Sequence, residues 1–220
     1  MSEEVLVPKM KRMDAKDREI HIPWFNIALI FFCTLLIIAS TFINLNIKHY
    51  IIPSGLFLGK TLNYEDYVYS IYFIPQIPVI MFVSSFLGKK MGLSSIILYI
   101  LIGLFFAPVF ALGGGLGYIA EYGFGYILAY IPAAVIAGNL FEQKYSFKNM
   151  IKAAIFGVLL IHIVGILYMI FVALLKGSGA GFIGGWIAAQ SGLKIVYDLV
   201  ASFVLILIGK YLHSALKFVL

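Results

Sequence analysis

The chain has 220 residues, of which 62% are apolar and 12% charged, and its formal net charge is +6. Soluble domains average about 25% charged residues, so this composition and a mean hydropathy of +1.02 exclude an ordinary soluble fold. A single cysteine, Cys33, excludes a disulfide framework and a cysteine metal site. The sequence therefore predicts an integral membrane protein, and we expect neither a metal nor a cofactor.

Six apolar stretches follow a mixed-charge tail at residues 1–22, which is expected to be cytoplasmic. Each stretch is close to the roughly 20 residues that a membrane-spanning helix needs. Barrel strands would alternate polar and apolar residues, so these uniform runs predict helices. Residues 23–220 are expected to form one all-α membrane domain, a bundle of six transmembrane helices at about 23–45, 68–87, 93–112, 118–138, 151–175 and 195–212.

The basic residues predict how this bundle is oriented. Twelve of the sixteen Lys and Arg residues lie in the N-terminal tail, near 89–90, at 144–152 and near the C-terminus. The alternate loops carry only Lys48, Lys60, Lys176 and Lys194. Cytoplasmic loops are enriched in Lys and Arg, so both termini are expected in the cytoplasm. The positive charge thus reports topology, and no nucleic-acid partner is expected.

Two long connections are expected on the outer side with this topology. The loop at 46–67 is rich in aromatic and turn residues, and the loop at 176–194 contains the flexible run GSGAGFIGGW. Loops of about 20 residues in a compact bundle are often functional, for example as lids. Both segments remain open to a second interpretation as mere connectors.

A glycine and aromatic cluster at 107–138 joins the third and fourth expected helices. Glycine permits tight turns and lets a ligand approach the backbone closely. The cluster, APVFALGGGLGYIAEYGFGY, therefore predicts either a ligand wall or a tight turn that packs helices. Small residues recur along both helices, for example Ala129, Ala133 and Ala137, and predict close helix packing. Pro132 is expected to kink the fourth helix.

Polar residues within apolar spans are costly and so carry information about function. Glu121 and Asp198 lie near the outer starts of the fourth and sixth spans, where either ligand contact or interfacial solvation explains them. Gln76 and His162 lie within spans and fit either ligand contact or interhelical hydrogen bonds. The chain contains neither a zinc-protease pattern nor a phosphate-binding loop, so an enzyme is not expected.

Several of these motifs together resemble the BioY family, the biotin-specific S-component of energy-coupling-factor (ECF) transporters. The resemblance is carried by YFIPQIP (72–78), FLG (86–88), PVFALGGGLGY (108–118) and YGFGY (122–126), and more weakly by His162 and Asp198. It implies a six-helix bundle that holds biotin near the outer face. It also implies a transmembrane coupling protein and a pair of cytoplasmic ATPases as partners.

The chain departs from the family pattern at three places. Tyr122 and Gly123 stand where Pro-Thr is common, and Ala201 replaces the lysine of an Asp-x-x-Lys motif that begins at Asp198. Lys194 is a candidate replacement for that lysine. The alanine-rich surface that docks the coupling subunit is only partly present, as Ala28, Ala39 and Ser40.

The function predicted from the resemblance is biotin uptake across a bacterial-type cell membrane. A pocket for another vitamin or a lipoate-like acid, and a non-transporting membrane scaffold, remain alternatives. Carboxylates would accept from the ureido N–H groups, tyrosines and Gln76 would donate, and glycine N–H groups would face the ligand carboxylate. The expected ligand-binding residues are Gln76, Phe110, Gly113, Gly114, Gly115, Gly117, Tyr118, Glu121, Gly125, Tyr126, His162, Lys194 and Asp198.

Overall fold

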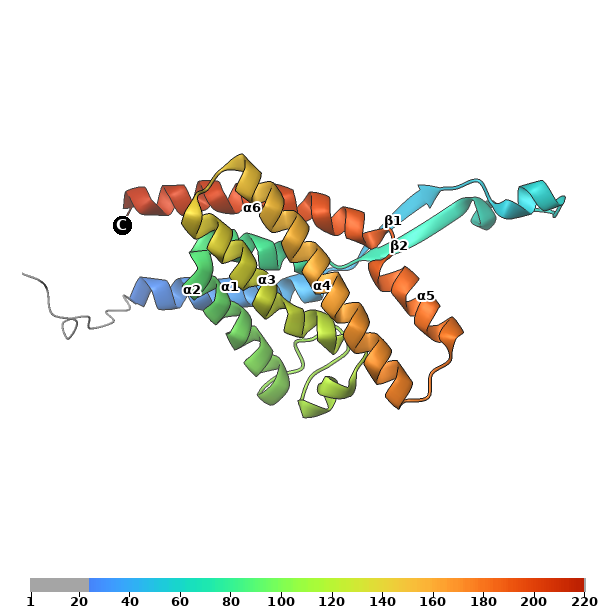
Figure 1. The fold of residues 1–220 in the computed structure, drawn as a ribbon, viewed down its shortest axis with the longest axis horizontal. Helices are drawn as coiled ribbons and strands as arrows, with labels where there is room; N and C mark the ends of the chain where they lie inside the picture. Colours follow the sequence, from blue (N-terminus) through green and yellow to red (C-terminus); the bar gives the residue numbers. More distant parts are fainter. Residues whose placement is uncertain (1–23, 220) are drawn as a thin grey trace, which may run out of the picture.

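The computed structural model describes residues 24–219 as a mostly helical bundle with a projecting β-hairpin (Figure 1). Five segments are long and apolar enough to cross a membrane, judged by length and composition. The expected N-terminal tail lies outside the described residues. The long helices are α1 (Trp24–Thr41), α2 (Gln76–Phe105), α3 (Phe124–Gln143), α4 (Phe147–Leu175) and α6 (Lys194–Val219).

Helix α2 corresponds to the second and third expected spans and is broken at Gly88. The backbone of Gly88 has φ 75° and ψ −178°, which is not helical. Glycine adopts this conformation readily, so the chain changes direction there and the two halves of α2 pack as separate segments. The expected start at residue 68 is wrong: α2 begins at Gln76, after Pro75. Pro78 lies in the first turn, where its missing N–H is not needed.

The first outer loop was expected to be an irregular lid or connector, but most of it is a β-hairpin. Strand β1 (Leu45–Tyr50) pairs antiparallel with β2 (Val68–Phe73), from Leu45 opposite Phe73 to Tyr50 opposite Val68. Two 3₁₀ turns, η2 (Ser54–Leu58) and η3 (Tyr64–Tyr67), connect the strands. Strand β2 is rich in aromatic and β-branched residues, which favour strands and explain why helix does not continue here.

Two further boundaries differ from the expectation. Residues 176–194 were expected as a flexible loop, yet they contain the helix α5 (Ala180–Ser191). The third and fourth spans were expected to meet near residue 115, but the chain is non-helical from Phe106 to Gly123 apart from η4 (Leu116–Ala120). Gly113 and Gly115 have φ of 125° and 83°, so these glycines are required by the turn.

The core lies where α2, α3 and α4 meet, and small residues bring these helices close together. Ala129, Ala133 and Ala137 are fully buried on α3, as the small-residue pattern predicts. Gly125 packs against Tyr168 of α4, and Gly165 of α4 packs against Tyr126 of α3. The backbones therefore approach closely without leaving space for additional side chains.

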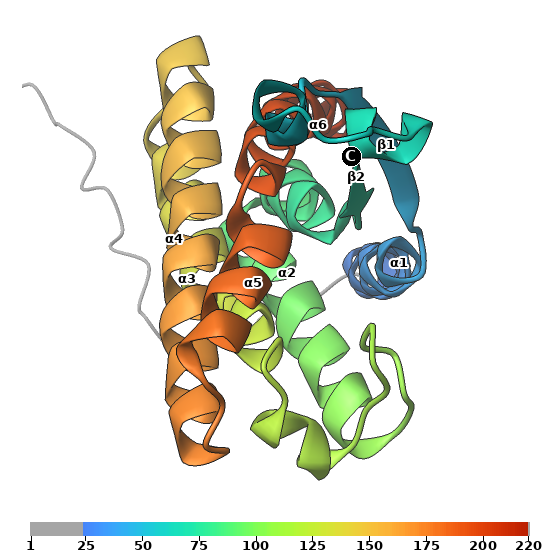
Figure 2. The same ribbon diagram turned by 90° about the vertical axis from the view of Figure 1, so that its right-hand side faces the viewer.

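The ends of the bundle have different characters. Helix α1 begins and α6 ends at the same end, whereas the hairpin, the 106–123 segment and α5 lie at the opposite end (Figure 1). Figure 2 looks at this second end and shows α1 and α4 on opposite sides, with α2 between them. The cavity described below is lined by residues from this second end.

Candidate ligand-binding site

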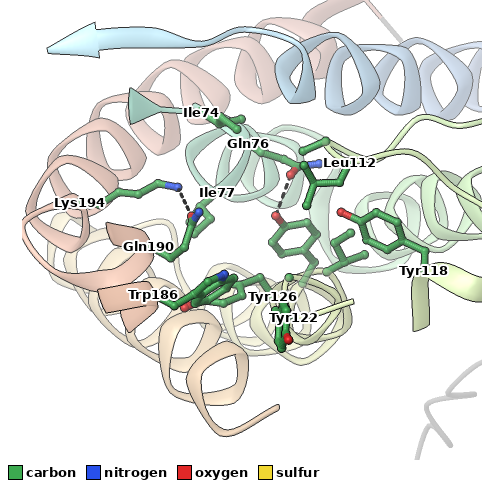
Figure 3. A pocket seen from close by; sticks show the side chains of 14 residues that line it. Ile74, Gln76, Ile77, Leu112, Tyr118, Tyr122, Tyr126, Trp186, Gln190 and Lys194 are labelled. Carbon is green, nitrogen blue, oxygen red and sulfur yellow. Dashed lines mark hydrogen bonds between the residues drawn. The ribbon is translucent and has the colours of Figure 1, made fainter. Parts of the chain in front are cut away.

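A cavity of about 220 Å³ lies among α2, α3, α5, α6 and the 106–123 segment (Figure 3). Drug-sized ligand pockets typically measure roughly 300–1,000 Å³, so this cavity suits a small molecule. Its walls are mostly aromatic and aliphatic, with a few polar groups. The lining residues are Ile74, Gln76, Ile77, Ala111, Leu112, Tyr118, Tyr122, Gly123, Tyr126, Ile127, Tyr130, Trp186, Gln190 and Lys194.

Gln76, the first residue of α2, is held by side chains from three helices. Its Nε2 donates to Thr41 Oγ1 of α1 and to Tyr99 Oη of α2, each at 2.7 Å. Its Oε1 accepts from Tyr130 Oη of α3 at 2.9 Å. Both amide hydrogens are therefore used inside the protein, and the group left for a ligand is the second lone pair of Oε1. The sequence interpretation had expected Gln76 to donate.

Tyr118 projects into the cavity from η4 and is supported from behind by Phe110. The two ring centroids are 4.7 Å apart, and Phe110 is only 1% exposed. Phe110 therefore packs behind Tyr118 and does not line the cavity. Burial raises the pKa of Tyr118 above its usual value, with a smaller contribution from Glu121. The phenol therefore keeps its proton at neutral pH and can donate to a ligand.

Helix α5 supplies a wall that the sequence interpretation missed. Trp186 packs against the rings of Tyr122 and Tyr126, with centroids 6.5 and 5.7 Å apart. Because the sequence predicts a loop here, Trp186 and Gln190 are not among the expected ligand-binding residues. Tyr130 was also missed, although it follows Tyr126 by four residues on α3 and so shares its face.

Lys194 is the one charged side chain among the described residues that line the cavity. Its Nζ donates to Gln190 Oε1 at 3.4 Å. Figure 3 shows Lys194 and Tyr118 at opposite ends of the cavity. A second cavity, of about 310 Å³, lies between β2 and the α5–α6 junction and shares Gln190 and Lys194 with the first. The cation thus favours an anionic group at this end.

None of the five expected glycines lines the cavity. A Cβ on Gly114 would lie 2.7 Å from the carbonyl oxygen of Gly103, and one on Gly125 would collide with Tyr168. Nothing lies within 4 Å of a Cβ placed on Gly113, Gly115 or Gly117, and these residues are not among the lining set. In this structure the cluster forms a tight turn and packs helices, and Gly123 alone of the glycines in 107–138 faces the cavity.

Three other expected residues also lie outside the lining set. Glu121 is partly exposed after η4, away from the cavity. His162 and Asp198 are 1% and 0% exposed and lie behind the wall, with His162 Nε2 3.1 Å from Asp198 Oδ2. His162 connects to the wall through Ser191, which contacts Tyr126. Of the thirteen expected residues, the cavity is lined by Gln76, Tyr118, Tyr126 and Lys194.

Comparison with known proteins assigns the chain to a family. The model of the BioY family matches residues 10–218. The chain belongs to the BioY family. This BioY-family chain is a multi-pass membrane protein, consistent with its five long apolar segments.

Two curated relatives are similar over part of their length. The probable biotin transporter BioY of Lysinibacillus sphaericus is 36% identical over 99 residues, which cover 44% of this chain and 50% of the relative. The biotin transporter BioY of Thermotoga maritima is 32% identical over 108 residues, which cover 47% of this chain and 63% of the relative. The matches thus span about half to two thirds of these curated BioY relatives.

The fold of this BioY-family chain also resembles a solved structure. The crystal structure of the S-component for biotin from an ECF-type ABC transporter superposes with a TM-score of 0.62. The superposition covers 87% of this chain and 92% of the other, at 20% sequence identity. At that identity the likeness establishes a shared fold.

Proposed function

We propose that the chain is the substrate-binding membrane subunit of a biotin uptake system. The observation that carries the proposal is the cavity, which combines aromatic walls with acceptor oxygens on one side and a single cation at one end. Biotin has a bicyclic ring with two ureido N–H donors and a valerate chain that ends in a carboxylate. The two relatives named as biotin transporters support this choice of ligand.

The proposed orientation follows from the positions of the polar groups. The two ureido N–H groups would donate to oxygens in the set Gln76 Oε1, Tyr130 Oη and Tyr126 Oη. Tyr130 already donates its own hydrogen to Gln76. Tyr118 would donate to the ureido carbonyl. The carboxylate would meet Lys194, which takes the place of the family lysine missing at Ala201. Apolar rings, including Trp186, would cover the bicycle.

We also propose six membrane crossings with both termini in the cytoplasm. The two halves of α2, on either side of Gly88, would cross separately and so raise the five candidate segments to six. Twelve basic residues fall on one side and four on the other, which supports this orientation. The cavity would then open toward the outside.

Transport is proposed to require an ECF coupling protein and a pair of cytoplasmic ATPases, with this chain acting as a binding subunit and not as an enzyme. Ala28 and Ala39 are exposed on α1 and are available for docking. Ser40 is buried and donates to the Ile37 carbonyl, so it is not part of that surface. The docking surface therefore carries two of the three small residues that the sequence predicts for it.

Uptake of labelled biotin tests the proposal. The chain is expressed with and without an ECF coupling module in bacteria that can neither make nor import biotin. We expect uptake above the empty vector, and we expect Lys194→Met to reduce apparent affinity by roughly 10- to 100-fold, because a charged hydrogen bond is lost. Lys210→Met, in the distal part of α6, is the matched control. Vector-level uptake in both backgrounds would contradict a role in biotin transport.

A further inference from the structure

A chain of polar side chains connects the cavity wall to the interior of the bundle. It begins at Tyr126 on α3 and passes through Ser191 at the end of α5 to His162 on α4 and Asp198 on α6. Tyr126 Oη lies 2.5 Å from Ser191 Oγ, which lies 2.9 Å from His162 Nδ1. His162 Nε2 lies 3.1 Å from Asp198 Oδ2. Four helices thus contribute to one continuous hydrogen-bonded path.

The charge state of His162 determines the direction of every hydrogen bond in this path. A neutral imidazole has one N–H, and the Asp198 carboxylate accepts it from Nε2. Nδ1 is then an acceptor, so the Ser191 hydroxyl donates to it. Ser191 Oγ in turn accepts from the Tyr126 hydroxyl. Tyr126 therefore offers only oxygen lone pairs to the cavity.

Protonation of His162 reverses these directions. Both ring nitrogens become donors, so Nδ1–H donates to Ser191 Oγ. The Ser191 hydrogen can no longer point at His162 and turns to Tyr126 Oη instead. The Tyr126 hydrogen is released toward the cavity. The same wall then presents a donor where it had presented an acceptor.

We propose that His162 is a positioning residue whose neutral form prepares Tyr126 to accept from the ligand, so that binding is coupled to loss of a proton from His162. This inference rests on the proposed function, because it assumes a ligand with N–H donors. The rest of the wall agrees with it: Tyr130 donates to Gln76 Oε1 and so also presents lone pairs. A protonated His162 would place one donor among these acceptors, facing the N–H groups of the ligand.

Charged and titratable groups from α3 and α6 lie around His162. Helix α6 contributes Asp198 in direct contact and Lys194 one turn earlier, and α3 contributes Tyr126 and Tyr130. Helix α5 (Ala180–Ser191) carries no titratable side chain. Asp198 Oδ1 has no hydrogen-bond partner within the part of the chain described here, so His162 is the main support of this carboxylate.

The test is the pH dependence of biotin binding to the purified full chain in detergent, from about pH 5.5 to 8, the range in which histidine changes charge. We expect affinity to fall as pH is lowered, by up to about tenfold per pH unit for a one-proton linkage. His162→Gln, whose amide does not titrate, should bind with a flat profile. Ser191→Ala and Tyr126→Phe interrupt the path at other points and should flatten the profile too. His213→Gln is the matched control, since His213 contacts the Phe86 carbonyl and not this path.

The slope of the profile, and not the absolute affinity, is the readout. Titration of the ligand itself affects all variants equally, and a smaller folded fraction that is constant with pH does not change the slope. A wild-type profile that is flat, or a His162→Gln profile as steep as the wild type, would overturn the inference while leaving biotin binding intact. Absence of biotin binding by the wild-type chain at every pH would reject the proposed function, and the inference with it.

Discussion

Gln76 joins three helices at the cavity wall through its single amide group. Thr41 of α1, Tyr99 of α2 and Tyr130 of α3 all bond it, and it is 8% exposed. A buried polar group costs free energy when its partners are removed, so these four side chains depend on one another. The amide thereby fixes both the shape of the wall and the direction in which Tyr130 points.

Gln76→Leu keeps a similar volume but removes all three hydrogen bonds. Leaving buried hydroxyl groups unpaired costs about 1–3 kcal/mol each, so we expect biotin affinity to fall by roughly 10- to 100-fold and the melting temperature to fall as well. Equilibrium binding and thermal unfolding in detergent measure the two effects. Gln143→Leu, at the exposed end of α3, is the control. Unchanged binding by Gln76→Leu would remove this residue from the site.

Substitutions can distinguish a glycine of the 107–138 cluster that packs helices from one that lines the cavity. Gly125→Ala would force a methyl group against Tyr168, and overpacking typically costs about 1–3 kcal/mol. We therefore expect a lower melting temperature. Gly123→Ala instead places its methyl group at the cavity, 4.0 Å from Tyr118 Oη, and should alter binding with little loss of stability. Equal destabilisation by both substitutions would show that Gly123 also serves only packing.

Part of the site could be predicted from single residues. Gln76 stands out because polar groups in apolar spans need partners, and Tyr126 belongs to the aromatic and glycine run at 122–126; both line the cavity. The glycines could not be assigned, because the same residue type serves turns, helix contacts and ligand walls. His162 was expected either to touch the ligand or to bond another helix, and Asp198 either to touch the ligand or to be solvated at the interface. The structure bonds them to each other behind the wall. Sequence spacing does not reveal which of two polar groups is nearer to a cavity.

At the scale of elements, the hairpin is attached to the bundle through Tyr197 on α6. The Tyr197 ring contacts His49 of β1 and Phe73 of β2, with centroids 5.6 and 6.1 Å apart. Its hydroxyl also hydrogen-bonds His49 Nε2. One residue of the helix therefore holds both strands.

Tyr197→Ala should loosen the hairpin without unfolding the helices. We expect faster amide hydrogen exchange in β1 and β2, because strands that lose their packing open more often. Mass spectrometry of deuterium uptake measures this by segment. Tyr211→Ala, at a 68% exposed position of α6, is the control. Unchanged exchange in both strands would mean that pairing between the strands is sufficient to hold the hairpin.

Elements were harder to predict where apolar runs were short or rich in glycine. VYSIYF is apolar enough to continue a span, and a short apolar run fits strand and helix alike, so the sequence predicts helix where the structure has β2. Helix α5 was missed because three glycines in AGFIGGWIAAQS indicate a loop. The long runs of α1 and α4 left no such ambiguity, and their positions agree with the expectation to within a few residues.

The whole molecule has one end that carries the cavity and one that carries both the start of α1 and the end of α6 (Figure 1). The distribution of basic residues predicts which end faces the cytoplasm, because it does not depend on where each helix begins. The sequence predicts six apolar spans, whereas five described segments are long and apolar enough to cross a membrane, so the sixth crossing stays a prediction. The break at Gly88 falls where the sequence predicts a connection between the spans at 68–87 and 93–112.

Cysteine labelling tests this orientation in intact cells. Cysteines replacing Lys60 and Lys176 should react with an impermeant thiol reagent from outside, whereas those replacing Lys90 and Lys148 should not. All four positions are exposed, and the native Cys33 is fully buried, so the background is low. Labelling of Lys90→Cys from outside would contradict both the orientation and the outward-facing cavity.

Equilibrium binding of a vitamin panel to the purified chain in detergent tests whether the chain is a biotin-binding subunit. We expect saturable binding of biotin with one site per chain, and weak or no competition from lipoate and vitamins that lack a ureido group. Gln76→Leu should weaken that binding, whereas Gln143→Leu should not. Tighter binding of another vitamin, or no binding by a chain that unfolds cooperatively on heating, would contradict that role.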